Sequence, residues 1–415
     1  MTKFDKGFIA RRDFLRTGAG FLTALGASNA VAAKVVQPTL PDSMLYPGRP
    51  DEDYGLPSIH EKTVKRLVKP PRPNSPFAVS YTPIHTQKGI ITPSGLHFGS
   101  HHSGVPDIAA ETHELYIHGL TEKSLKFSVA DLMRYPMHGG IHFIECSGNT
   151  WAQGMFDSAA PQTCTELYGL ISGSEWIGVP AKLLLQEAGL RPGAKWVIAE
   201  GADSGTLARS IPIEKMLDDA LIALYQNGER LRPAQGYPMR LMLPGWEGNT
   251  SIKWLRRLEV SDQPAYTKDE SRAYTETLKD GTIERFSLNM GVKSVITHPS
   301  AGHMLPERGY YEISGLAWTG YGKIKKVEVS DNGGKNWVTA DLHPPVLNKS
   351  LTRFSVPWQW AGQEAKLQSR ATDEYGNIQP SHAAWKTIYA QGSYNHYNAI
   401  QTWLISREGT LSNVF

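Results

Sequence analysis

The sequence predicts an α+β domain followed by a β-sandwich of immunoglobulin type. From about residue 76 to residue 262, short apolar runs alternate with Gly/Pro turns, and helical and strand patterns are mixed. After about residue 280 helical patterns nearly vanish, and alternating segments follow at the spacing of sandwich strands. The length of 415 residues favours two or three domains with a core of ordinary size.

Composition limits the classes of function. The net charge of +3 gives no reason to expect a nucleic-acid partner. Two cysteines cannot form a disulfide framework, and no Cys-x-x-Cys-His run is present, so we expect no covalently bound haem in this chain. If the protein handles electrons, it must therefore pass them to another chain.

The N-terminus carries a twin-arginine pattern. Arg11 and Arg12 precede an apolar stretch, residues 18–33, which ends in small residues and is too short to span a bilayer. We expect residues 1–33 to be a twin-arginine signal peptide and the mature protein to be periplasmic. Because no later segment reaches the length of a membrane-spanning helix, we expect no membrane span.

The first part of the mature chain contains an arm and the mixed domain. Residues 34–75 are rich in Pro and charge, which predicts an extended arm with one short helix near 59–68. In the domain, 76–279, Ser128 and Pro180 begin helical patterns and Gly189 ends the second. The predicted helices are 128–135, 180–188 and 213–219. The predicted strands are 114–118, 141–144, 196–199, 239–243 and 258–260.

The second domain, 280–392, is predicted from strands alone. The alternating segment 323–330 precedes a turn, Asp331-Asn332-Gly333-Gly334, and the segment 336–341, which together are typical of a β-hairpin. Further strands are expected at 351–356, 364–371 and 384–390, and residues 393–415 are expected to be a C-terminal tail.

Cys146 follows the predicted strand and begins a turn, Ser147-Gly148-Asn149. This position holds the thiol from one side and leaves it accessible from the other. Three roles are open from the residue type: a buried structural thiol, a disulfide with Cys164, or a metal ligand or nucleophile. His142 lies four residues earlier on the same strand face and is a possible base for a nucleophile.

Two further clusters could bind ligands. The histidines 97, 101, 102, 113 and 118 lack the spacing of a zinc site, and no nucleotide-binding glycine motif is present. The stretch 236–255 places Arg240 and Lys253 in Gly/Pro-rich backbone, which suits an anion cradle. The alternative is that both are solvated surface charges.

Together these stretches resemble the sulfite oxidase family of molybdopterin enzymes. The family has a Cys-x-Gly-Asn motif after a strand, which Cys146 to Asn149 matches, and a Gly-aromatic-Pro-x-Arg…Lys-Trp-Leu stretch, which 236–255 matches. Residues 98–106 match its Phe-x-x-x-His-x-x-x-Pro segment. The resemblance implies a molybdopterin domain, a dimerisation domain of the β-sandwich type and a molybdenum cofactor.

The resemblance also implies roles for particular residues. Cys146 would be the metal ligand. The implied cofactor-binding residues are Phe98, Ser100, His101, His102, Asp203, Gln235, Arg240, Ser251, Ile252 and Lys253. The residues implied to act beside the metal are Trp151, Trp176 and Tyr274.

Departures from the family pattern bear on the substrate. Sulfite oxidases bind their small dianion with arginines, and this chain has Ser100, Trp151 and Tyr397 at the matching positions, although Arg209 or Arg272 could reach the site instead. The absence of these arginines argues for a less charged substrate that is carried by a partner protein. This pattern resembles that of the Sox-type sulfane dehydrogenases of the family.

This subgroup implies partners. We expect a c-type cytochrome subunit, a carrier protein that bears the sulfur substrate, and a homodimer through the C-terminal domain within a heterotetramer. The alternatives are a sulfite dehydrogenase, a related sulfoxide reductase with reversed electron flow, and a cofactor-free protein on the same scaffold.

Overall fold

The computed structural model describes residues 44–45, 47, 50–70 and 73–415, so the expected signal peptide lies outside the described residues. Residues 61–415 form one compact unit. Residues 50–58 are exposed and carry no helix or strand. The helix expected near 59–68 is wrong beyond a single turn, η2 (Ile59–Glu61), because Leu67 and Val68 form β1 (Leu67–Val68) against β2.

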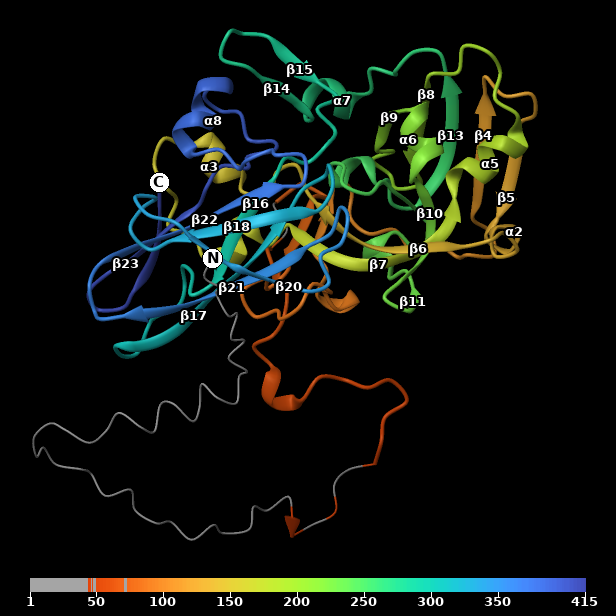
Figure 1. The fold of residues 1–415 in the computed structure, drawn as a ribbon. Coiled ribbons are helices and arrows are strands. Elements are labelled where there is room, and N and C mark those ends of the chain that lie inside the picture. Colours follow the sequence, from red (N-terminus) through yellow and green to blue (C-terminus); the bar gives the residue numbers. More distant parts are fainter. Residues whose placement is uncertain (1–43, 46, 48–49, 71–72) are drawn as a thin grey trace, which may run out of the picture. The chain divides into compact units, whose positions relative to one another are not determined.

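Three sheets make the frame of the first domain, and one of them carries the strands β5, β4, β13, β8 and β9 side by side (Figure 1). The strands of this sheet are β4 (Glu114–Gly119), β5 (Leu125–Ser128), β8 (Trp196–Gly201), β9 (Ala208–Pro212) and β13 (Leu255–Ser261). The second sheet joins β6 (His138–Glu145), β7 (Ile171–Pro180), β10 (Leu221–Gln226), β11 (Glu229–Arg230) and β12 (Arg240–Met242). The third joins β1, β2 (Ala78–Tyr81) and β3 (Gly99–His101).

Short helices complete this domain. Ser128 caps α2 (Val129–Leu132) in a capping box, and α5 (Ala181–Ala188) ends at Gly189, whose φ of +70° only glycine adopts without strain. The face of α5 that carries Leu184 and Leu185 is buried in the core between the sheets. The other helices are α3 (Trp151–Met155), α4 (Cys164–Tyr168), α6 (Ile213–Asp218) and α7 (Lys268–Arg272), with single turns η3 (Ser94–Leu96), η4 (Pro233–Gln235) and η5 (Gly248–Thr250).

A hairpin of β14 (Thr275–Thr277) and β15 (Ile283–Arg285) precedes the second domain, which is a sandwich of two sheets. One sheet contains β16 (Lys293–His298), β17 (Gly309–Trp318), β20 (Asp341–His343) and β21 (Thr352–Trp360). The other contains β18 (Ile324–Ser330), β19 (Val338–Thr339), β22 (Ala365–Asp373), β23 (Thr402–Ile405) and β24 (Leu411–Val414). The predicted hairpin is present as the pair β18 and β19.

Two expectations for the second domain are wrong. Residues 384–390 do not form a strand, because Ser381 caps α8 (His382–Ile388) and Trp385 is buried on its inner face. The segment expected to be a tail contributes β23 and β24, which extend the sheet from β22. The sandwich therefore continues to residue 414. In the described part of the chain, no helix has the length and apolarity to cross a membrane.

Candidate functional site

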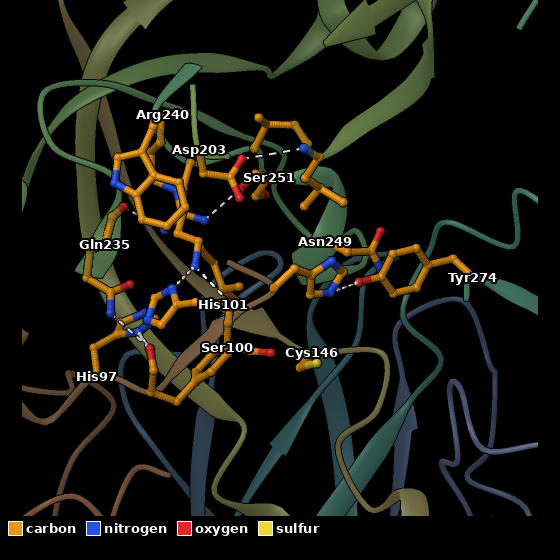
Figure 2. A pocket seen from close by; sticks show the side chains of 18 residues that line it. His97, Ser100, His101, Cys146, Asp203, Gln235, Arg240, Asn249, Ser251 and Tyr274 are labelled. Atoms are coloured by element: carbon orange, nitrogen blue, oxygen red, sulfur yellow. Dashed lines mark hydrogen bonds between the residues drawn. The ribbon is translucent and has the colours of Figure 1, made fainter. Parts of the chain in front are cut away.

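A pocket lies where β3, the end of β6 and the start of β12 meet the loops around residues 203–207 and 248–254. Its empty space is about 690 Å³ with open solvent included. Most of the residues predicted from the sequence line it together (Figure 2). They are Phe98, Ser100, His101, His102, Cys146, Asp203, Gln235, Arg240, Ser251, Ile252, Lys253 and Tyr274.

Cys146 follows β6 directly, and its backbone is fixed while its thiol reaches the pocket. Its N–H donates to the carbonyl of Leu170 at 2.9 Å, and its carbonyl accepts from the N–H of Asn149 at 2.8 Å. Figure 2 shows the sulfur beside the pocket, with Ser100 and Tyr274 on either side in this view. Burial raises the pKa of the Cys146 thiol. A cation at the site would be needed to favour the thiolate.

Cys164 is not a partner for this sulfur. Both cysteines are free, and Cys164 is buried in α4 within the core that joins the two domains. The ring of His142 lies 3.3 Å from the carbonyl oxygen of Lys349 and does not line the pocket. Neither the disulfide nor a Cys–His nucleophile is therefore formed.

The loop after Cys146 closes against the turn at residue 248. The side chain of Asn149 donates to Glu145 at 2.9 Å and accepts from the N–H of Leu170 at 3.1 Å. A Cβ at Gly248 would lie 2.7 Å from the carbonyl oxygen of Glu145. Glycine is therefore required for the two loops to approach each other at the pocket wall.

Arg240 is buried and Lys253 is partly buried at one end of the pocket. The guanidinium of Arg240 donates to the carbonyls of Gln235 at 3.1 Å and Ser251 at 2.8 Å. The ammonium of Lys253 donates to the carbonyl of Ser100 at 2.8 Å. Burial lowers the pKa of Arg240 to about 9. Burial, and then the charge of Arg240, lower the pKa of Lys253 to about 7.

These cations are not solvated surface charges. Arg240 is 3% exposed, and neither it nor Lys253 takes part in an ion pair among the described residues. A buried and a partly buried cation side by side, neither in an ion pair, are costly unless an anion joins them. This end of the pocket therefore suits an anionic group such as a phosphate.

Two buried polar atoms in the pocket wall also point to a ligand. His97 Nε2 and Asn249 Oδ1 have no hydrogen-bond partner in the described part of the chain. Buried polar atoms of this kind normally have partners. The pocket therefore offers a thiol that suits a soft metal, a cationic end, and polar atoms without a partner in the described residues. Together these features fit a metal-bearing group with an anionic substituent.

Tyr274 closes the opposite side of the pocket. Its hydroxyl lies 3.1 Å from Nε2 of His102, and the guanidinium of Arg209 lies 4.7 Å from its ring centre. Arg209 is itself buried and pairs at 3.3 Å with both Glu247 and Glu270. Its charge is therefore compensated, and Arg209 does not line the pocket.

Three aromatic residues lie elsewhere than the resemblance implied. Trp176 does not line the pocket but is fully buried behind it, with the guanidinium of Arg240 5.0 Å from its ring centre. Trp151 begins α3 and packs edge-on against Phe156 at 5.8 Å. Tyr397 is buried against Trp385 in the second domain. Each of the three side chains packs against a neighbouring aromatic ring or guanidinium, and none of the three lines the pocket.

Sequence reasoning missed part of the lining. The residues that it did not assign are His97, Ile144, Leu207, Gly248, Asn249 and Trp254. Asn249 lies inside the stretch 236–255, so the short turn before Ser251 could have indicated it. In the described ranges, no cluster of three or more His, Cys, Asp or Glu side chains could hold a metal ion by itself.

Both halves of the chain match known families. Residues 102–268 match the family described as oxidoreductase molybdopterin binding domain, and residues 284–402 match the Mo-co oxidoreductase dimerisation domain. The second match runs into β23, which agrees with the sandwich continuing beyond residue 392.

The chain is also similar to one solved structure and to curated relatives. A chain in the crystal structure of the sulfane dehydrogenase SoxCD from Paracoccus pantotrophus is 39% identical, with a TM-score of 0.87 over 94% of this chain and 100% of that one. The mitochondrial sulfite oxidase of Mus musculus is 29% identical over 74% of this chain, which spans 61% of the relative. The NADH nitrate reductase of Ulva prolifera is 29% identical over 74% of this chain, which spans 40% of that relative. The chain therefore belongs to the Sox-type sulfite oxidase family of molybdopterin oxidoreductases, and its cofactor is the molybdenum cofactor.

Proposed function

We propose that this protein is the molybdenum subunit of a periplasmic dehydrogenase that oxidises a reduced sulfur group, most suitably a sulfane sulfur presented on a carrier protein. It passes the electrons to a c-type cytochrome subunit. The similarity to a sulfane dehydrogenase supports this proposal, and the twin-arginine pattern at Arg11 and Arg12 supports export.

The proposed class of substrate rests on one observation: in the described part of the chain, no free arginine lines the part of the pocket near Cys146, where the substrate would bind. Arg240 is the only arginine among the described lining residues, and it lies with Lys253 at the anion-binding end. Ser100 replaces one family arginine, and Arg209 is held by two glutamates. A small dianion such as sulfite therefore lacks the bidentate clamp that it needs, whereas a less charged sulfur does not need one.

Different residues of the pocket would bind different parts of the cofactor. Cys146 would bind the metal through its thiolate, and Arg240 and Lys253 would hold the phosphate of the pterin. The carboxylate of Asp203 and the unpartnered atoms of His97 and Asn249 are placed to bond its polar groups. When bound, the cofactor supplies oxygen-atom transfer to sulfur and removes two electrons per oxygen.

The chain's own residues then orient the substrate and handle protons. For each oxygen added, one sulfur–oxygen bond forms, two O–H bonds of water break, and two protons and two electrons leave. Tyr274 and Ser100 flank the thiol and offer hydroxyl groups to the substrate. The dimerisation-domain match supports a homodimer, and we propose that two such units join with cytochrome subunits in a heterotetramer.

The test compares substrates on protein matured in a host that makes the cofactor. A peptide bearing a cysteine persulfide should be oxidised with cytochrome c as acceptor, and free sulfite should be a poor substrate. Fast turnover of sulfite at micromolar concentrations would favour the sulfite dehydrogenase instead. A preparation without molybdenum would contradict the proposal altogether.

A further inference from the structure

A chain of three side chains leads from the pocket toward the surface of α7. Tyr274 and His102 line the pocket, and their hydroxyl and Nε2 are 3.1 Å apart. On the other side of the same imidazole, Nδ1 lies 3.5 Å from Oδ1 of Asp269. The side chains of His102 and Asp269 are 33% and 14% exposed, so the imidazole itself reaches solvent.

The backbone holds this order of residues. Asp269 lies in the first turn of α7, and its carbonyl accepts the N–H of Tyr274 at 3.1 Å. The rings of His102 and Tyr274 are nearly parallel, with 13° between their planes, and Phe77 lies 6.3 Å from the imidazole. The imidazole is therefore confined between a phenol and a carboxylate.

We infer that Tyr274, His102 and Asp269 form a proton exit from the pocket, in which Asp269 is a positioning residue that acts through His102. This inference rests on the proposed oxidation of sulfur by water, which must release two protons from the pocket for each oxygen transferred. For one of these protons, the tyrosine hydroxyl passes its proton to Nε2 of His102 and regains one from the pocket, the carboxylate stabilises the imidazolium, and Nδ1 releases a proton toward solvent. Proton exchange of the imidazole with solvent then restores the Nδ1-protonated tautomer before the next proton is accepted.

The surroundings of Tyr274 fit the part of a relay and not that of a base. Burial raises the pKa of the Tyr274 phenol well above its usual value, and the charge of Arg209 offsets this only in part. Arg209 pairs with Glu247 and Glu270, so its position beside the ring is fixed.

The test uses the cofactor-loaded enzyme with its best sulfur substrate and three variants of α7. We expect Asp269→Asn to lower kcat about tenfold with little change in KM, and to raise the solvent deuterium isotope effect on kcat. Asp269→Glu, which keeps the carboxylate, should restore most of the rate. Lys268→Gln, at the exposed neighbouring position, should behave as wild type.

A second measurement does not depend on turnover. ¹⁵N NMR should show that the Nδ1-protonated tautomer of His102 predominates in the wild type and declines in Asp269→Asn. An unchanged tautomer in Asp269→Asn would overturn the inference. A wild-type kcat and isotope effect in Asp269→Asn would also overturn it. So would equal losses of kcat in Asp269→Asn and Asp269→Glu together with lowered melting temperatures, because these would indicate a purely structural role. If no reduced sulfur compound is oxidised at all, the proposed function fails, and the NMR result still decides whether Asp269 positions His102.

Discussion

The ammonium of Lys293 lies 2.9 Å from Oε1 of Glu145, and both side chains are fully buried. Glu145 ends β6 immediately before Cys146, whereas Lys293 begins β16 in the second domain. The same carboxylate accepts from the indole N–H of Trp318 at 2.6 Å and from Asn149 at 2.9 Å. One buried group therefore joins the loop that carries the metal ligand to the dimerisation domain.

The first prediction concerns this pair. Glu145→Gln should lower the free energy of unfolding by about 3–5 kcal/mol, because it leaves the charge of Lys293 buried without its partner. Urea denaturation of the cofactor-free protein measures this change. Adding Lys293→Met should recover part of the loss. Lys386→Met, which breaks the exposed pair with Asp157, should cost less than about 1 kcal/mol. Equal costs at the two pairs would contradict this account.

The second prediction concerns the metal ligand. Cys146→Ser replaces a soft thiolate with a hard hydroxyl and should abolish turnover per bound cofactor. Sulfur oxidation with ferricyanide as acceptor, normalised to molybdenum content, measures it. Cys164→Ala serves as the matched control, since this thiol is buried away from the pocket. That variant should lose stability and keep its activity, and retained activity in Cys146→Ser would exclude the thiolate as an essential ligand.

The third prediction follows from the lowered pKa of Lys253, about 7 in the folded protein. An unfolded lysine titrates near pH 10.4, so above about pH 7 the unfolded state binds one more proton than the folded state. The contribution of this group to stability therefore rises with pH in that window and is constant below it. Melting temperatures of the cofactor-free protein between about pH 7 and 8.5 should rise more steeply in the wild type than in Lys253→Met. If melting temperature rose with pH equally in the wild type and in Lys253→Met, burial would not lower the pKa of this lysine.

The fourth prediction concerns specificity. Ser100→Arg places a guanidinium at a substrate-side position, and should raise kcat/KM for free sulfite about tenfold, the equivalent of one charge-assisted hydrogen bond of about 1.5 kcal/mol. Steady-state kinetics with sulfite and with a persulfide peptide measure the two ratios. Ser124→Arg adds the same charge at an exposed site away from the pocket and should leave both ratios unchanged. A lower rate with both substrates in Ser100→Arg would show that Ser100 has another task.

The sequence predicted best where several site residues lie in one continuous stretch. Arg240, Ser251, Ile252 and Lys253 share a single segment, and the structure brings all four to one pocket with Cys146. A residue's position in the sequence did not predict whether its side chain points into the pocket. Trp151 lies five residues after Cys146, yet it begins a helix and its ring packs against Phe156.

The fold shows the same limit. Residues 384–390 carry apolar side chains at a spacing that suits a strand or a short helix, and the cap at Ser381 decides for the helix. The strands β23 and β24 are short, and their place depends on pairing with β22, which local pattern does not report. Tertiary contacts therefore decided both outcomes.

The loop that carries Cys146 is completed by segments far along the chain. The N–H of His396 donates to the carbonyl of Ser147 at 3.0 Å, and the hydroxyl of Thr150 donates to the carbonyl of Tyr397 at 2.9 Å. In α3, Gln153 donates to Asn413, 260 residues further on, at 2.9 Å. During synthesis the ribosome delivers β6 and its thiol long before these partners exist. The loop after Cys146 and helix α3 therefore gain these contacts only once residue 413 has been made, so this part of the fold is completed after translation of the second domain.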